Sequence, residues 1–102
     1  MKENTVDRFD DIRQWATDRN IFEGSDVKSQ FVKLAEEMGE LGSAIAKGRP
    51  FEFCDAVGDM VVVLTILSEF NGVPIEECID EAWHSIKNRK GRMVDGVFIK
   101  ED

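Results

Sequence analysis

Apolar side chains recur every three or four residues along most of the chain, which is the spacing of amphipathic helices. The pattern predicts a first helix over residues 5–18, with Asn4 or Thr5 as its N-cap. It breaks over residues 19–24. A second helix is then expected from a cap at Ser25 or Asp26 to about Lys47.

A third helix is predicted over residues 51–70, with Pro50 in its first turn. Its central run, MVVVLTIL, is β-branched and also fits a strand. We favour a helix because Glu52, Asp55 and Asp59 are spaced three and four residues apart, and because the segment is too long for one strand. The run is apolar on nearly every side, so we expect a second subunit to cover part of it.

A fourth helix is expected to open at Pro74 and to end near Lys90. The segment RMVDGVFIK then alternates apolar and polar residues around Asp95-Gly96, which predicts a short hairpin or an extended tail. The fold class is therefore all-α. We expect one domain over residues 1–102, a four-helix bundle with this hairpin or tail, completed by oligomerisation.

Charge narrows the possible partners. The 102 residues include 13 Lys and Arg against 21 Asp and Glu, a formal net charge of -8. This balance opposes binding to nucleic acid or to an anionic membrane. The sequence has no apolar stretch of membrane-spanning length and no signal-peptide pattern, so we expect a cytoplasmic protein. Cys54 and Cys78 lie at apolar helical positions and are expected to be reduced, buried thiols.

Two rows of carboxylates stand out on the second and third helices: Glu36, Glu37 and Glu40, then Glu52, Asp55 and Asp59. Antiparallel packing through the short loop at residues 48–50 would bring the rows face to face near that loop. Basic residues are scarce in both segments, and carboxylates against a core need a cation to offset their desolvation. Ligation by oxygen alone suits Mg²⁺, with Mn²⁺ able to substitute.

Mg²⁺ held by carboxylates commonly bridges to substrate phosphates, which indicates hydrolysis of a nucleotide or a related phosphoanhydride. The alternative is an ordinary solvated acidic surface. The neighbouring Gly39, Gly42 and Gly58 favour a site, because glycine costs helix stability and here permits close approach or leaves room for a ligand.

The segments EEMGE, DAVGDMVVVL and IKNRKGRM resemble those of the MazG-like all-α nucleoside triphosphate pyrophosphohydrolases, in their short single-domain form. The resemblance implies Mg²⁺-dependent hydrolysis of (deoxy)nucleoside triphosphates to the monophosphate and pyrophosphate. It also implies a role in nucleotide-pool control or house-cleaning, and assembly as a homodimer or homotetramer.

By this resemblance the catalytic residues are Glu36, Glu37, Glu40 and Asp59. The expected metal ligands are Glu37, Glu40, Asp55 and Asp59. Ala56 stands where the family usually has a glutamate, and either Asp55 or Glu52 is a candidate replacement. One well-formed Mg²⁺ site is therefore a safer expectation than two.

The family's fourth helix usually supplies an asparagine and basic side chains to the phosphates, and the matching residues here are Lys87, Asn88 and Arg89. His84 stands where some relatives have a lysine, and Trp15 is a candidate for base contact. The basic residues equally suit a helix C-terminus, and the tryptophan equally suits a core.

Two rival functions fit the same residues. One is a non-catalytic helical oligomer with a regulatory role, which kept the fold and lost turnover through Ala56. The other is a hydrolase of another phosphoanhydride, such as phosphoribosyl-ATP or an alarmone. No residue makes a base-reading motif, so pocket shape must set the preferred base and sugar.

Overall fold

A computed structural model describes residues 5–101, with side chains from residue 8 onward. In chain order its elements are α1 (Thr5–Asp18), α2 (Ile21–Gly24), α3 (Val27–Lys47), α4 (Pro50–Phe70), α5 (Ile75–Ile86), β1 (Gly91–Val94) and β2 (Val97–Lys100). The prediction of an all-α chain with a C-terminal hairpin is confirmed. The predicted cap at Asn4 and the side chain of Thr5 lie outside the described residues. Within these bounds, no helix is both long and apolar enough to cross a membrane.

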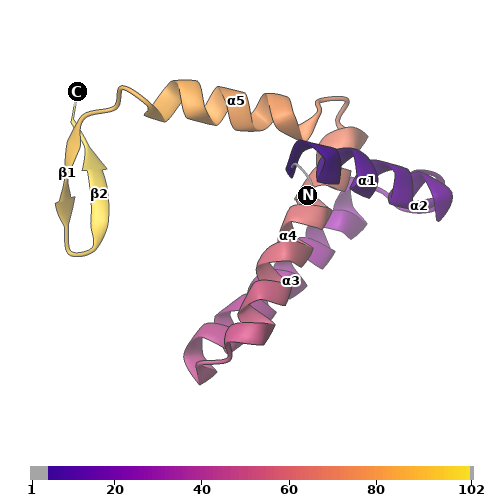
Figure 1. Cartoon of the computed structure of the whole chain (residues 1–102), viewed down its shortest axis with the longest axis horizontal. Coiled ribbons are helices and arrows are strands. Elements are labelled where there is room, and N and C mark those ends of the chain that lie inside the picture. Colours follow the sequence, from indigo (N-terminus) through magenta and orange to yellow (C-terminus); the bar gives the residue numbers. More distant parts are fainter. Residues whose placement is uncertain (1–4, 102) are drawn as a thin grey trace.

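Helices α3 and α4 pack against each other as a long antiparallel pair (Figure 1). The side chain of Asp26 caps α3 by accepting a hydrogen bond from the backbone N–H of Ser29 at 2.7 Å. Gly48 ends the helix in the left-handed conformation, at φ 62°, and Pro50 begins α4. Both predicted helices therefore have the expected bounds.

Two predicted boundaries were wrong. Residues 19–24 are not a continuous break, because only Asn20 adopts positive φ, at 58°, and Ile21–Gly24 forms the short helix α2. The fourth helix ends at Ile86 instead of near Lys90. The reason is the β-hairpin, since its closing backbone hydrogen bond runs from the N–H of Glu101 to the carbonyl of Lys90 at 2.8 Å.

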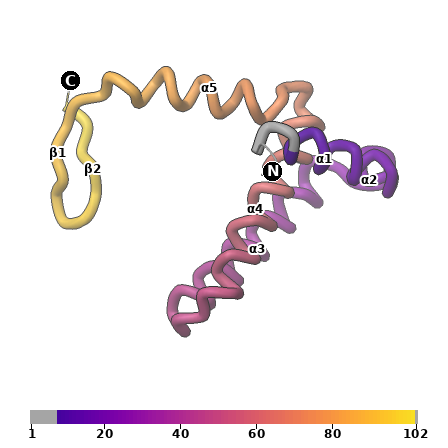
Figure 2. Tube along the Cα trace, viewed as in Figure 1, coloured from indigo at the N-terminus to yellow at the C-terminus, as the bar shows by residue number. Residues whose placement is uncertain are grey.

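The helices of one chain do not close into a compact bundle. Helix α5 leaves the end of α4 and carries the β-hairpin away from α3 and α4 (Figures 1 and 2). The radius of gyration is 16.2 Å, against about 13 Å for a compact domain of this length. The apolar side chains that are buried are few: Ala16, Ala44, Ala56, Val63, Ile66 and Ile75.

Many large apolar side chains are consequently exposed in the single chain. On α4, Val57, Val61 and Leu64 are at least a third exposed, although the sequence predicted cover on more than one side of this helix. The predicted burial of Cys54 and Cys78 was also wrong, because both are free, exposed thiols. These surfaces are not covered by the described residues.

Arg13 ties α1 to the far end of the helical pair. Its guanidinium donates to both carboxylate oxygens of Glu76, at 2.8 and 2.6 Å, and to Asp10 at 2.6 Å, and it also approaches Glu69 on α4 at 3.4 Å. Hydrogen bonding from Arg13 lowers the pKa of Glu76 below its usual value. The ion-pair network therefore links α1, α4 and α5.

Replacing Arg13 with methionine keeps the apolar stem and removes the charge, and we expect it to destabilise the fold by about 1–3 kcal/mol at neutral pH. The contribution of Glu76 to the free energy of unfolding is complete above the ordinary glutamate pKa, about 4.3. This contribution is lost as the pH falls through the lower pKa that Glu76 has in the folded chain, because the folded chain binds the proton less readily than the unfolded chain. Urea unfolding of both proteins across the acidic range measures the difference.

The matched control is Arg49→Met, because the pair that Arg49 forms with Glu52 at 3.4 Å is solvent-exposed on both sides. It should change the free energy of unfolding little. An Arg13→Met protein as stable as the wild type at neutral pH would contradict the role given to this network.

Candidate metal centre

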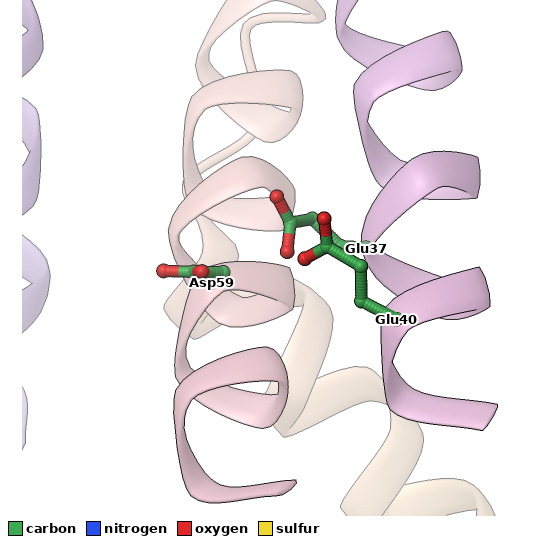
Figure 3. A group of neighbouring side chains, drawn as sticks. All are labelled: Glu37, Glu40 and Asp59. Atoms are coloured by element: carbon green, nitrogen blue, oxygen red, sulfur yellow. The ribbon is translucent and has the colours of Figure 1, made fainter. Parts of the chain in front are cut away.

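Three carboxylates from α3 and α4 meet near the middle of the helical pair. One oxygen each of Glu37, Glu40 and Asp59 lies within 4.8 Å of the others. Glu37 and Glu40 extend from α3 toward α4, which carries Asp59 (Figure 3). The rows therefore meet further from the loop than the sequence predicted. The spacing of Glu37 and Glu40, one turn apart, gives them the shared helix face.

Glu37 is the unusual member of the group, because its side chain is buried. The residue is only 4% exposed, and its Oε2 has no hydrogen-bond partner among the described residues. A buried acceptor without a partner costs about 1–3 kcal/mol, and more when it is charged. A carboxylate oxygen in this state, with two more carboxylates beside it, is a position that a cation would stabilise.

The pKa shifts within the group also favour a bound cation. The pKa of Asp59 is raised, first by desolvation and then by the charges of Asp55 and Glu37. The pKa of Glu40 is raised first by its close approach to the carboxylate of Glu37 and then by the charge of that residue. Negative charge on Glu37 thus disfavours the charged forms of Glu40 and Asp59, which is an arrangement that a divalent ion relieves.

Lys33 is a neighbour that the sequence analysis missed. Its Nζ lies 3.3 Å from Oε1 of Glu37 and 3.8 Å from Oε2 of Glu36. Hydrogen bonding to Glu37 raises the pKa of Lys33. The i, i+4 spacing of Lys33 and Glu37 was a usable signal for this pair. The ammonium pairs with one oxygen of Glu37, and the other oxygen, Oε2, has no hydrogen-bond partner among the described residues.

The other acidic candidates lie outside the group. Glu36 is exposed and faces Lys33, and Glu52 is exposed and pairs with Arg49. Asp55 is also exposed, although its charge acts on Asp59. Ala56, at the position of the family glutamate, is buried. The structure therefore assembles Glu37, Glu40 and Asp59, while ligand roles for Glu36 and Asp55 stay predictions.

Trp15, predicted from the sequence to be a candidate for base contact, lies on α1 near Asp59 of α4. Together with Ile12 of α1 and Val62 of α4, it lines a cavity of about 410 Å³ that Asp59 also borders. The guanidinium of Arg19 lies 4.8 Å from the centre of the Trp15 ring. A volume in this range is typical of small-molecule sites. The packing of α1 on α4 creates this cavity, and no local motif signals it.

The residues predicted to hold phosphates lie elsewhere in the chain. Lys87, Asn88 and Arg89 follow the end of α5 and are exposed, and so is His84, whose Nδ1 is 2.7 Å from the carbonyl oxygen of Asp80. In this chain α5 leads them away from the pair of helices that carries the carboxylates (Figure 1). The structure does not bring them to the group of three.

The donor set fits Mg²⁺ or Mn²⁺. All three side chains offer oxygen, the liganding atoms lie within 4.8 Å of one another, and the unpartnered Oε2 of Glu37 is buried at the group. Hard divalent cations take such oxygens together with water and substrate phosphate. Within residues 5–101, the groups that could hold a metal include no Cys or His, so a zinc-type site is not indicated.

Comparison with known proteins places this fold and site in a family. Residues 9–85 match the family model of phosphoribosyl-ATP pyrophosphohydrolase. The chain therefore belongs to the phosphoribosyl-ATP pyrophosphohydrolase family, in the same all-α nucleoside triphosphate pyrophosphatase superfamily as the MazG proteins. The narrower resemblance to MazG-like enzymes stays a prediction.

One relative is an uncharacterised 18.2 kDa protein in the rep-hol intergenic region of Haemophilus phage HP1 (strain HP1c1). It is 48% identical over 62 residues, which are 61% of this chain and 38% of the relative. The matched segment thus spans about two-fifths of the relative's length. No solved structure matches the chain.

Proposed function

We propose that this protein is a Mg²⁺-dependent pyrophosphohydrolase that converts (deoxy)nucleoside triphosphates to nucleoside monophosphate and pyrophosphate. The observation that carries the proposal is the buried Glu37. One of its oxygens lies within 4.8 Å of an oxygen each of Glu40 and Asp59, and its Oε2 has no hydrogen-bond partner among the described residues. Membership of a family named for a pyrophosphohydrolase supports the reaction class. The motifs shared with MazG-like enzymes support the triphosphate as substrate.

In this proposal Glu37, Glu40 and Asp59 would hold the cation, which supplies positive charge for the phosphate oxygens during hydrolysis. Lys33 orients Glu37 by holding its Oε1 at 3.3 Å. Glu40 is exposed, so the group is open to solvent on the side where substrate enters. Trp15, across the neighbouring cavity, offers an aromatic face to the base.

A second candidate substrate is phosphoribosyl-ATP, which the family match favours. It carries the same kind of phosphoanhydride and releases the same pyrophosphate, so the carboxylate group suits both. The difference lies at the base, because phosphoribosyl-ATP carries an additional sugar phosphate there. The size and lining of the cavity beside Trp15 and Asp59 would decide between the two.

The test is pyrophosphate release from a panel of canonical and modified (d)NTPs and from phosphoribosyl-ATP, with Mg²⁺, Mn²⁺ or EDTA. Mass spectrometry of the nucleotide product identifies the bond that is cleaved. We expect metal-dependent turnover with the nucleoside monophosphate as product. Turnover of phosphoribosyl-ATP alone would select the second candidate. No turnover of any of these compounds would overturn the proposal and favour the non-catalytic regulatory protein.

The exposed apolar side chains also bear on the oligomeric state. We propose that the protein acts as a homodimer or homotetramer, because a single chain leaves Val57, Val61 and Leu64 of α4 partly exposed. The extended shape supports this assembly, since a radius of gyration of 16.2 Å exceeds that of a compact domain of this length.

A further inference from the structure

Lys33 is a basic residue at the edge of the carboxylate group. It lies on α3 one turn before Glu37, and its Nζ is 3.3 Å from Oε1 of that residue and 3.8 Å from Oε2 of Glu36. The two partners differ in burial, since the side chain of Glu36 is 61% exposed and that of Glu37 only 5%. The shorter contact therefore joins the ammonium to the one buried carboxylate of the group.

The charge of Lys33 also reaches the other two members of the group. The pKa of Asp59 is raised first by desolvation, and the charge of Lys33 opposes this rise. The pKa of Glu40 is raised first by its close approach to Glu37, and the charge of Lys33 opposes that rise as well. Arg8 borders the cavity beside Asp59, but its guanidinium donates to an aspartate of its own helix at 2.7 Å. The ammonium of Lys33 is thus a cation that acts on all three carboxylates.

The formal charges of these four side chains balance with one divalent cation. In their ionised forms, the carboxylates of Glu37, Glu40 and Asp59 carry three negative charges. The ammonium of Lys33 offsets one of them, and two remain. One divalent cation neutralises this remainder, whereas a second would leave the group with an excess of positive charge. The four side chains therefore match a single divalent ion.

The two partners of the shorter contact differ in their freedom to move. The side chain of Lys33 is 54% exposed, and a lysine has a flexible stem and a strongly hydrated ammonium. Glu37 is held by burial and keeps its place when the ammonium turns into solvent. An exposed cation beside a buried carboxylate stabilises that carboxylate while no metal is bound. The same cation repels a divalent ion that binds the carboxylate.

We propose that Lys33 is a built-in counter-cation of the metal centre, which stabilises the carboxylates without metal, limits the site to one divalent cation and weakens the affinity for it. The inference rests on the proposed function for the presence of a metal site. That site has its own support in the buried Glu37, whose Oε2 has no hydrogen-bond partner among the described residues. Weak affinity suits a cation that bridges to substrate phosphates, because it can then enter and leave with the substrate.

Replacing Lys33 with methionine removes the charge and keeps most of the apolar stem. The metal-free Tm should fall by about 4 °C, because Glu37 is then buried without the ammonium. The affinity for Mn²⁺ should rise about tenfold, because the repulsion of the bound ion is gone. Calorimetry measures the first quantity, and the loss of the EPR signal of free aqueous Mn²⁺ measures the second. A residue that only supports the fold would lower both quantities.

Three further variants serve as controls. Lys28→Met makes the same change at an exposed lysine in the first turn of α3, outside the carboxylate group, and should alter neither quantity. Lys33→Arg keeps the charge and should stay near the wild type in both. In the Glu37→Gln background, Lys33→Met should change the metal-free Tm little, because the buried charge that the ammonium stabilises is already absent.

The same titrations state what would overturn the proposal. Unchanged or weaker Mn²⁺ binding by Lys33→Met would do so. The wild type gives a test that needs no variant, because we expect one Mn²⁺ per chain, and two per chain or none would also overturn the counter-cation. Pyrophosphate release decides the proposed function separately. A protein that shows the expected Mn²⁺ binding and cleaves no phosphoanhydride would overturn the function and leave the role of Lys33 standing.

Discussion

Replacing Glu37 with glutamine is expected to lower Mg²⁺-dependent pyrophosphate release by about 100-fold or more. Glutamine has nearly the same shape, so the change removes the charge of the buried carboxylate and little else. Glu37 is the one carboxylate of the group that is buried with an unpartnered oxygen among residues 5–101, and its loss should remove the anchor of the site. Steady-state kinetics with a saturating triphosphate measure the effect.

The matched control is Glu23→Gln, the same chemical change at a glutamate of α2. Glu23 is exposed and outside the group of three, so this variant should keep activity within about threefold of wild type. Equal losses in the two variants would show that the structure does not distinguish them as described. Wild-type activity in Glu37→Gln would exclude the carboxylate group as the catalytic site.

Stability gives a second readout for the same pair of variants. In the metal-free protein, Glu37 raises the pKa values of Glu40 and Asp59, so its charge opposes theirs. Glu37→Gln should therefore raise the metal-free Tm and abolish the rise in Tm that Mg²⁺ gives the wild type. A wild-type Tm that does not respond to Mg²⁺ or Mn²⁺ at millimolar concentrations would contradict a metal site here.

Enlarging Ala56 to leucine is expected to damage both the fold and the site. Ala56 is 2% exposed and lies in the first half of α4, the helix that packs along α3 (Figure 1). A leucine there overpacks the contact, at a cost of about 1–3 kcal/mol. It also forces α3 and α4 apart one turn from Asp59, and a displacement of about 1 Å at a site can cost about 100-fold in rate.

Ala46→Leu is the control for this prediction, because Ala46 lies on α3 and is exposed. The same enlargement at an exposed position does not fill the contact between α3 and α4, so stability and activity should stay near wild type. Urea unfolding and pyrophosphate release measure both variants. An Ala56→Leu protein with normal stability and normal turnover would show that close packing of these two helices does not position the carboxylates.

The same alanine stands where the MazG-like proteins that this chain resembles usually have a glutamate. A glutamate at position 56 would place a charged side chain at a buried position, whereas Asp55 and Glu52 are exposed. Neither of them joins the group of three oxygens. The proposal therefore uses one metal site, formed by Glu37, Glu40 and Asp59, as the sequence analysis preferred.

Short-range sequence signals determined where most of the helices and the hairpin begin and end. The cap at Asp26, the end at Gly48 and the start at Pro50 depend on a few neighbouring residues, and each is where the sequence indicates. The hairpin turn at Asp95-Gly96 follows for the same reason, since both residues adopt positive φ. Helical spacing likewise places Glu37 and Glu40 on one face.

Tertiary structure decided the features of the site that the spacing of apolar residues does not specify. Burial of Glu37, the exposed position of Asp55 and the cavity beside Trp15 depend on which helices pack together. The direction of α5 also depends on this packing. An apolar stripe specifies that a helix must be covered, but it leaves open which chain covers it. The sequence thus determined the helices and the carboxylates they carry. Packing decided that three of those carboxylates meet and that the residues predicted to bind phosphate lie far from them in the same chain.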